Sequence, residues 1–186
     1  LIGSTLGDWN YNANLLKEQH MALEYLKDNS YDQIFIVGGS FLYLDSLYDV
    51  AYVFQNGYIL GIVPKVYLNF EQRRNFASGD EFVNNPVTVE FLDEEVLFGN
   101  VNFINSLYNV SFGIEIGDDL GLISDAQIIF NLNSSSYYLG KNEEYEKAKL
   151  MFAERNPRFV EAQSAYEVTK NEFDSFMKKN KITDFD

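Results

Sequence analysis

The N-terminal part of the chain shows a helical repeat of apolar residues. Between residues 10 and 28 they stand at Ala13, Leu16, Met21, Leu23 and Leu26, with Leu15 and Ala22 beside them. This spacing predicts an amphipathic helix with one face toward a core. Asn10 or Asn12 would cap it, because an asparagine side chain accepts hydrogen bonds from the first backbone N–H groups of a helix.

Shorter apolar runs follow and predict strands. Residues 32–39 are apolar on both faces, which is typical of a strand covered on both sides. Residues 47–55 and 58–63 are joined by Asn56 and Gly57, the dipeptide most favoured in two-residue hairpins. Residues 80–100 are acidic and alternating, which predicts an antiparallel pair at a sheet edge.

The β-branched and aromatic run at residues 110–120 predicts a buried strand that ends in a glycine and two carboxylates. Residues 126–131 predict another strand covered on both faces. Beyond residue 141 the chain is charged and helix-prone, with apolar side chains on one face. We therefore expect an α/β core over residues 1–140 and a helical extension over residues 141–186.

Charge and composition exclude several classes of function. The net charge is -14, and residues 1–140 hold 5 of the 14 basic and 18 of the 28 acidic residues, which argues against nucleic-acid and anionic-membrane binding. The chain has no cysteine and a single histidine, His20, so we expect no disulfide and no cysteine or multi-histidine metal site. No apolar run has the length of a membrane span.

Lys65 ends the segment Gly61-Ile-Val-Pro-Lys and is the only lysine between Lys27 and Lys141. On the residues alone it reads as a surface lysine at a strand end. Three blocks change this interpretation. They are the segment from Leu47 through Asn56-Gly57 to Leu68, the run Gly113-Ile-Glu-Ile, and Ala126-Gln-Ile-Ile-Phe-Asn131 with its serine-rich turn.

In order and spacing these blocks resemble the nitrilase superfamily, most closely the glutaminase domain of glutamine-dependent NAD synthetases. The resemblance implies an αββα sandwich, here truncated, with a Glu, Lys and Cys active site. Lys65 takes the place of the lysine that stabilises the oxyanion, and Gly117 takes the place of the cysteine nucleophile. The catalytic glutamate would fall just before Leu1.

The same alignment places Glu71 or Gln72 at a second acidic position of the family. It also gives a set of candidate binding residues, namely Tyr67, Asp118, Asn131 and Ser135. We expect no cofactor and no metal, although a magnesium or calcium site made of carboxylates alone stays open without a loop signature for it. Asp118 and Asp119 are poor substitutes for a thiol, because a carboxylate is a weak acyl acceptor from an amide.

Three hypotheses about function stay open. The first is a degenerate domain with a structural or protein-interaction role, whose partner is another chain or a second copy bound through sheet edges and the C-terminal helices. The second is the glutaminase domain of an NAD synthetase with Gly117 replacing the cysteine. The third is a module that binds a small amide or carboxylate. We expect a cytoplasmic location, or an organelle matrix if an N-terminal segment was removed.

Overall fold

The computed structural model divides the chain into two units, Leu1–Tyr137 and Tyr138–Asp186. It describes residues 7–105, 108–119, 121–122, 126–133, 139–140, 143, 147, 168–171 and 179. In the second unit the described residues 143, 147, 168–171 and 179 are helical, and the rest of the predicted extension lies outside the described residues. The predicted boundary at residue 140 stays a prediction.

The first unit is mixed α/β. Its described part begins with a 3-10 helix and one α-helix, η1 (Gly7–Tyr11) and α1 (Ala13–Asp28). The next elements are the strands β1 (Ile34–Tyr43), β2 (Ser46–Gln55) and β3 (Tyr58–Pro64), and the 3-10 turns η2 (Gln72–Arg74) and η3 (Asp80–Phe82). The last are β4 (Val87–Phe91), β5 (Glu94–Phe98), β6 (Phe103–Asn105), β7 (Val110–Ile116) and β8 (Ile128–Leu132).

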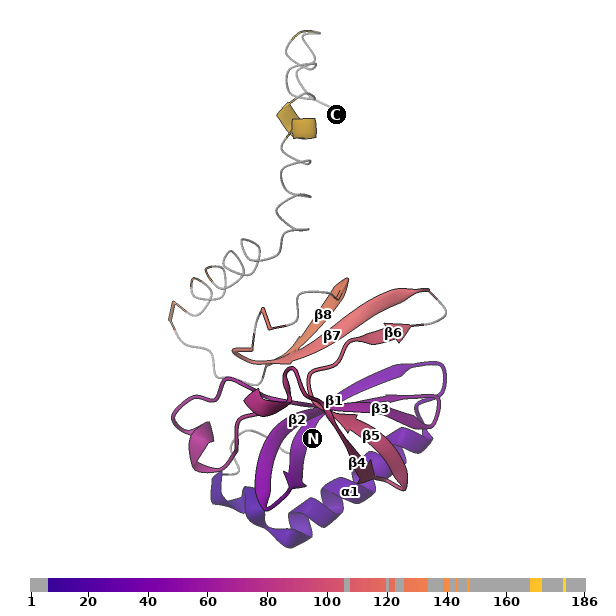
Figure 1. Ribbon diagram of the computed structural model, residues 1–186, viewed down its shortest axis with the longest axis vertical. Coiled ribbons are helices and arrows are strands. Elements are labelled where there is room, and N and C mark those ends of the chain that lie inside the picture. The colour runs from indigo at the N-terminus through magenta and orange to yellow at the C-terminus, as the bar shows by residue number, and fades with distance from the viewer. Residues whose placement is uncertain are drawn as a thin grey trace. The chain divides into compact units, whose positions relative to one another are not determined.

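The described strands form two sheets (Figure 1). The larger has the order β1-β2-β3-β5-β4, and the smaller has the order β6-β7-β8. β3 pairs with β5 and β7 with β8 in parallel, and the other pairs are antiparallel. The α/β class predicted from the sequence is therefore confirmed.

Two apolar clusters hold these layers together. Between the sheets, Val53 and Val63 of the larger sheet pack with Phe112 and Ile114 of the smaller one. On its other face the larger sheet packs against α1 through Leu23, next to a cluster of aromatic rings that includes Tyr52 and Phe98. The described residues thus form one helical layer and two sheet layers.

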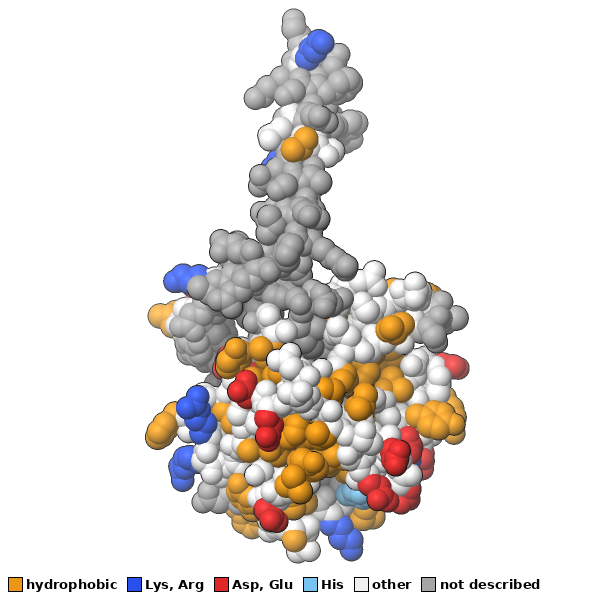
Figure 2. Space-filling model, in the orientation of Figure 1, with side chains coloured by type: hydrophobic (Ala, Val, Ile, Leu, Met, Phe, Trp, Pro, Cys, Tyr) orange, Lys and Arg blue, Asp and Glu red, His pale blue; other side chains and the backbone are white. Residues whose placement is uncertain are grey.

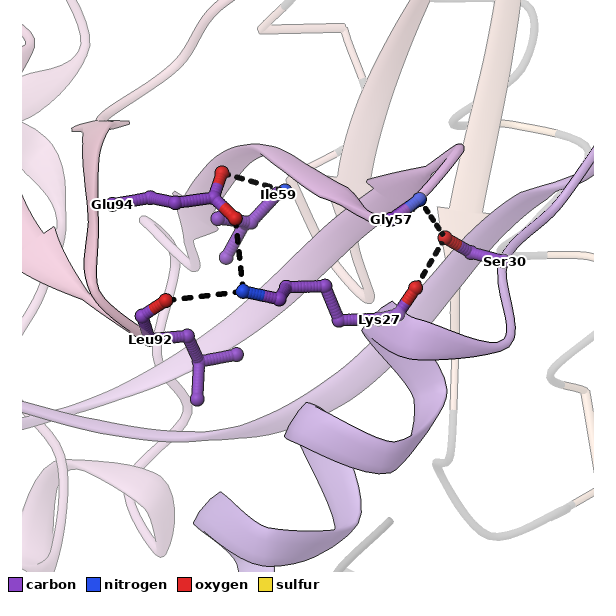
Figure 3. Close-up of polar contacts among 6 residues, drawn as sticks. All are labelled: Lys27, Ser30, Gly57, Ile59, Leu92 and Glu94. Atoms are coloured by element: carbon purple, nitrogen blue, oxygen red, sulfur yellow. Dashed lines mark hydrogen bonds and ion pairs between the residues drawn. The ribbon is translucent and has the colours of Figure 1, made fainter.

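The predicted helix is confirmed, and Asn12 is its cap. The Asn12 Oδ1 atom accepts hydrogen bonds from the backbone N–H groups of Asn14 and Leu15 at 3.0 and 3.3 Å. The other end of α1 is fastened to the sheet (Figure 3). There the Lys27 ammonium contacts Glu94 at 2.9 Å and donates to the Leu92 carbonyl at 3.1 Å.

The Asn56-Gly57 hairpin is also confirmed, with φ angles of 54° and 81° at the turn. A second two-residue hairpin joins β1 to β2 through Leu44 and Asp45, whose φ angles are 46° and 63°. The sequence did not predict it, because leucine is not a residue that favours a positive φ. The antiparallel pair predicted over residues 80–100 is present as β4 and β5.

Two predictions about burial were wrong. β1 stands at the end of the larger sheet as described, and its first six residues are only half-buried. In β8, Ile128 and Phe130 remain 47% and 43% exposed, because β8 ends the smaller sheet as described. An apolar run shows that a strand is hydrophobic, but not how many layers cover it. Among the described residues, no helix has the length and apolarity needed to cross a membrane.

Candidate functional site

Lys65 and Gly117 lie against each other, although they are far apart in the sequence. A Cβ atom placed on Gly117 would be 2.8 Å from the Lys65 Nζ atom and 3.6 Å from its Cε atom. The ammonium therefore occupies the space into which a side chain at position 117 would project. The two positions that the family resemblance singles out are brought together by the fold.

Each of the two residues is fixed by backbone hydrogen bonds to the strand beside it. Lys65 directly follows β3, and its N–H donates to the Asp49 carbonyl on β2 at 2.8 Å. Gly117 directly follows β7, and its N–H donates to the Leu132 carbonyl on β8 at 2.8 Å. Its φ of 60° lies in the left-handed region, where glycine is favoured.

Asp119 joins the turn after Gly117 to the segment after Lys65. Its carboxylate accepts hydrogen bonds from the Val66 N–H at 3.0 Å and from the Tyr67 N–H at 2.6 Å. Only 2% of the residue is exposed. Burial raises the pKa of this carboxyl to about 6, although the two backbone donors and the Lys65 charge act in the opposite direction.

Lys65 is a buried cation, with 5% of its surface exposed. In the described part of the chain the only ion pair within 4 Å is Lys27–Glu94, so Lys65 has none there. The charge of Lys65 interacts with two nearby carboxylates, those of Asp119 and Asp49. Desolvation raises the pKa of Asp49, and the Lys65 ammonium opposes this shift.

The other predicted site residues have different places. Asn131 lies at the site, where its Nδ2 atom donates to the Gly117 carbonyl at 2.9 Å. Tyr67 contributes its backbone N–H, while its side chain is 54% exposed. Asp118 is exposed, and Ser135 lies outside the described residues.

Neither residue proposed for the second acidic position contacts Lys65 in the described structure. Glu71 is exposed. The Gln72 side chain accepts a hydrogen bond from the Asn69 N–H at 3.1 Å, and the Asn69 side chain accepts one from the Gln72 N–H at 2.9 Å. Gln72 is thus used in closing a local turn.

Three buried or partly buried carboxylates at this site were missing from the predicted set, namely Asp49, Glu115 and Asp119. Glu115 accepts a hydrogen bond from the Gly121 N–H at 2.9 Å. A sequence signal did exist for two of them, because Asp49 and Glu115 each interrupt a run of apolar strand residues. A charge in such a run is costly unless it is paired or hydrogen-bonded.

The arrangement can hold negative charge, since a fixed ammonium stabilises an anion or a developing oxyanion. Position 117 itself offers no nucleophile. Among the described residues, no group of three histidine, cysteine, aspartate or glutamate side chains is placed to bind a metal ion.

Comparison with solved structures identifies the fold. The chain is similar to a glutamine-dependent NAD+ synthetase from Cytophaga hutchinsonii, with a TM-score of 0.72 and 18% identity over 84% of this chain and 26% of that one. The fold is that of part of such synthetases. A glutamine-dependent NAD+ synthetase from Acinetobacter baumannii, solved with adenosine diphosphate, gives a TM-score of 0.58 and 22% identity over 82% of this chain and 27% of that one.

The chain thus spans about a quarter of the length of either synthetase. At these identities the likeness concerns the fold alone. No protein-family model matches the sequence, and a search of curated proteins found no match.

Proposed function

We propose that this chain is a catalytically silent member of the nitrilase-like amidases, with a structural or protein-interaction role. The observation that carries the proposal is the position of the Lys65 ammonium, 2.8 Å from where a Cβ on Gly117 would lie. The electrostatic half of an amidase site is present, and the group that would attack the amide carbon is not.

The neighbouring carboxylates do not replace that group. Asp119 is engaged by the backbone N–H groups of Val66 and Tyr67, and Asp118 is exposed. Loss of a nucleophile lowers the rate of such reactions by several orders of magnitude. The proposal includes a truncated αββα sandwich, in which the described helix and two sheets are three of four layers.

An interaction role is supported by the apolar side chains that the first unit exposes. Figure 2 shows apolar side chains gathered on one face of this unit, next to a group of acidic ones. Phe70, Leu44 and Ile104 are 85%, 79% and 69% exposed. A contiguous apolar face such as the one in Figure 2 marks interaction sites in soluble proteins.

The catalytic part of the proposal is tested by measuring ammonia release from glutamine and from small aliphatic amides. The native chain and the Gly117→Ser variant are expected to release none above buffer. Ammonia release by the native chain would overturn the proposal.

The interaction part is tested on the same preparation by light scattering and by binding of an apolar dye. We expect self-association or dye binding. A compact monomer that binds no dye would contradict the interaction role and leave the catalytic result unaffected.

A second candidate is a glutaminase domain whose cysteine has been replaced, and the fold shared with the two synthetases favours it. The Gly117→Cys variant tests it. Ammonia release from glutamine by this variant, lost again when Lys65→Met is added, would support this candidate over the silent domain. Both variants are made in a chain that also carries the family's catalytic glutamate, and release by neither would count against this candidate.

The third candidate, a module that binds a small carboxylate or amide, is favoured by the burial of Lys65 without an ion pair in the described residues. Calorimetric titration with glutamine and with glutarate tests it. Binding that disappears in the Lys65→Met variant is the expected result of this candidate, and no heat with either compound removes it.

A further inference from the structure

We propose that β8 pairs in the antiparallel direction with β8 of a second copy of this chain, so that the two smaller sheets join into one continuous sheet. This inference rests on the interaction role proposed above and adds the surface and the partner. β8 is the last strand of the smaller sheet as described (Figure 1). The backbone groups on the open side of such a strand are able to pair with another strand.

The open side of β8 follows from its ladder with β7. The two strands run in parallel with Ile116 opposite Leu132, and the Gly117 N–H donates to the Leu132 carbonyl at 2.8 Å. The backbone groups of Leu132 therefore face β7. Because these groups alternate in direction along a strand, those of Ile129 and Asn131 point away from β7. Among the described strands, none lies on that side of β8.

The other three edges of the described sheets are protected against such pairing. On the edge of β1, the Gln19 side chain donates to the Ser40 carbonyl at 2.6 Å and accepts from the Ser40 N–H at 2.8 Å. The edge strand β4 directly follows Pro86 and carries Glu90. The edge strand β6 has only 3 residues. Proline, charge, short length and a covering group are the usual means of keeping a sheet edge unpaired.

β8 lacks these protections and ends a row of aromatic rings. Residues 126–133 contain no charged side chain and no proline. Between centroids, the Phe112 ring lies 5.2 Å from the Phe103 ring and 5.9 Å from the Phe130 ring. Phe130 and Ile128 lie on the same face of the sheet as Phe112 and remain 43% and 47% exposed. A further strand beside β8 would remove this apolar surface from water.

The sequence of β8 makes a second copy the matching partner. A two-fold axis at Phe130 places Ile129 opposite Asn131 of the other copy, and these are the residues whose backbone groups point outward. The same axis places Phe130 opposite Phe130 and Ile128 opposite Leu132, which are cross-strand pairs that stabilise a sheet. Such a symmetric contact closes at two chains. Because β8 is uncharged, two chains of net charge -14 meet here with little local repulsion.

The first test measures association of the full chain by sedimentation over a range of concentrations, where a reversible monomer–dimer equilibrium is expected. Ile129→Pro removes an N–H from the open side of β8 and leaves the groups that face β7 in place. This variant is expected to raise the dissociation constant of the dimer about tenfold or more. Far-UV circular dichroism and the urea midpoint check that it folds.

Thr88→Pro is the matched control at another edge. A two-residue turn after Phe91 joins β4 to β5, so the backbone groups of Phe91 face β5 and those of Thr88 point away from it. Thr88→Pro therefore also removes one outward N–H, and it is expected to change the dissociation constant by less than about twofold. Equal weakening by Thr88→Pro and Ile129→Pro would overturn the proposal.

The second test reads the register and also decides the matter if Ile129→Pro does not fold. Since the chain has no cysteine, Phe130→Cys introduces a single thiol that meets its own copy across the two-fold axis. Oxidation with diamide is expected to give a disulfide-linked dimer. Ile104→Cys, at a residue of β6 that is 69% exposed, is the control and is expected to stay unlinked. Equal cross-linking of the two variants, or none of Phe130→Cys, would overturn the proposal.

A native chain that stays monomeric at every concentration would also overturn it. If that monomer binds an apolar dye, the interaction role stands and belongs to another surface. Ammonia release from an amide by the native chain would remove the catalytically silent domain and leave the dimer result readable.

Discussion

At the scale of single residues, Asp119 is the connection between the two halves of the candidate site. Its carboxylate accepts hydrogen bonds from the backbone N–H groups of Val66 and Tyr67, the two residues that directly follow Lys65 in the chain. The Lys65 backbone is thereby held against the turn that contains Gly117. Asp118, one position earlier, is exposed and gives a matched control.

We expect Asp119→Ala to lower the free energy of unfolding by about 1–3 kcal/mol, because it leaves the buried Val66 N–H and the partly buried Tyr67 N–H without an acceptor. Asp118→Ala should change it by less than about 0.5 kcal/mol. Urea denaturation measures both. Equal effects of the two substitutions would show that the hydrogen bonds of Asp119 do not stabilise the fold.

The raised pKa of Asp119 also predicts a pH dependence. The carboxyl titrates near pH 6 in the folded chain and near 3.9 in the unfolded chain, so the folded state holds the proton more tightly. Its contribution to stability is full below about pH 3.9 and is lost as the pH rises through about 6. The urea midpoint of Asp119→Asn should therefore fall less between about pH 4 and about pH 6 than that of the native chain. The raised pKa of Asp49 contributes a smaller fall of the same sign in the native chain and in the variant.

Gly117 provides a third prediction. Gly117→Ala places a Cβ at a φ of 60° and 2.8 Å from the Lys65 Nζ atom, whereas Gly57→Ala meets a similar φ of 81° with nothing within 4 Å. Both should lose roughly 1–2 kcal/mol from backbone strain, and Gly117→Ala should lose more because the lysine must move. The excess should disappear in a Lys65→Ala background, which a double-mutant cycle measures.

At the scale of elements, the attachment of α1 to the sheet depends on one of two adjacent glutamates. Glu94 binds the Lys27 ammonium at 2.9 Å and accepts the Ile59 N–H at 3.3 Å (Figure 3). Glu95 faces Glu90 across the ladder instead. Adjacent residues of the same type therefore have opposite electrostatic surroundings.

We expect Glu94→Ala to destabilise the fold by about 1–3 kcal/mol, since the Lys27 ammonium and the Ile59 N–H both lose a partner. Glu95→Ala should be neutral or slightly stabilising, because a repulsion is removed. Thermal or urea unfolding of the two variants decides this. A larger loss for Glu95→Ala would mean that the interpretation of the ladder is wrong.

At the scale of the whole molecule, the charge is the dominant feature. Residues 1–140 hold 18 acidic and 5 basic residues, and the excess negative charges repel one another in the compact state. Raising the salt concentration from about 0.05 to 0.5 M should therefore raise the urea midpoint, because it screens this repulsion. The effect should shrink near pH 4, where many carboxyl groups are protonated, and an unchanged midpoint at neutral pH would contradict the argument.

Local signals in the sequence predicted much of the fold. The helical spacing and cap of residues 12–28, the Asn56-Gly57 turn and the strand before Gly117 all depend on residues near one another in the chain. The pairing of Lys65 with Gly117 followed from the resemblance of whole blocks to a family. The β1–β2 turn escaped prediction, because Leu44 adopts a conformation that its residue type disfavours.

Only the tertiary structure decided which carboxylate holds the site and which surfaces remain exposed. Asp118 and Asp119 look alike in the sequence, and the fold buries one and leaves the other in solvent. A cleft on the helix side of the larger sheet is lined by residues of α1, β1, β2 and β4, and the exposure of Ile128 and Phe130 depends on where the described sheet ends. Each of these features is set by groups distant in the chain, whose approach no local pattern of residues encodes.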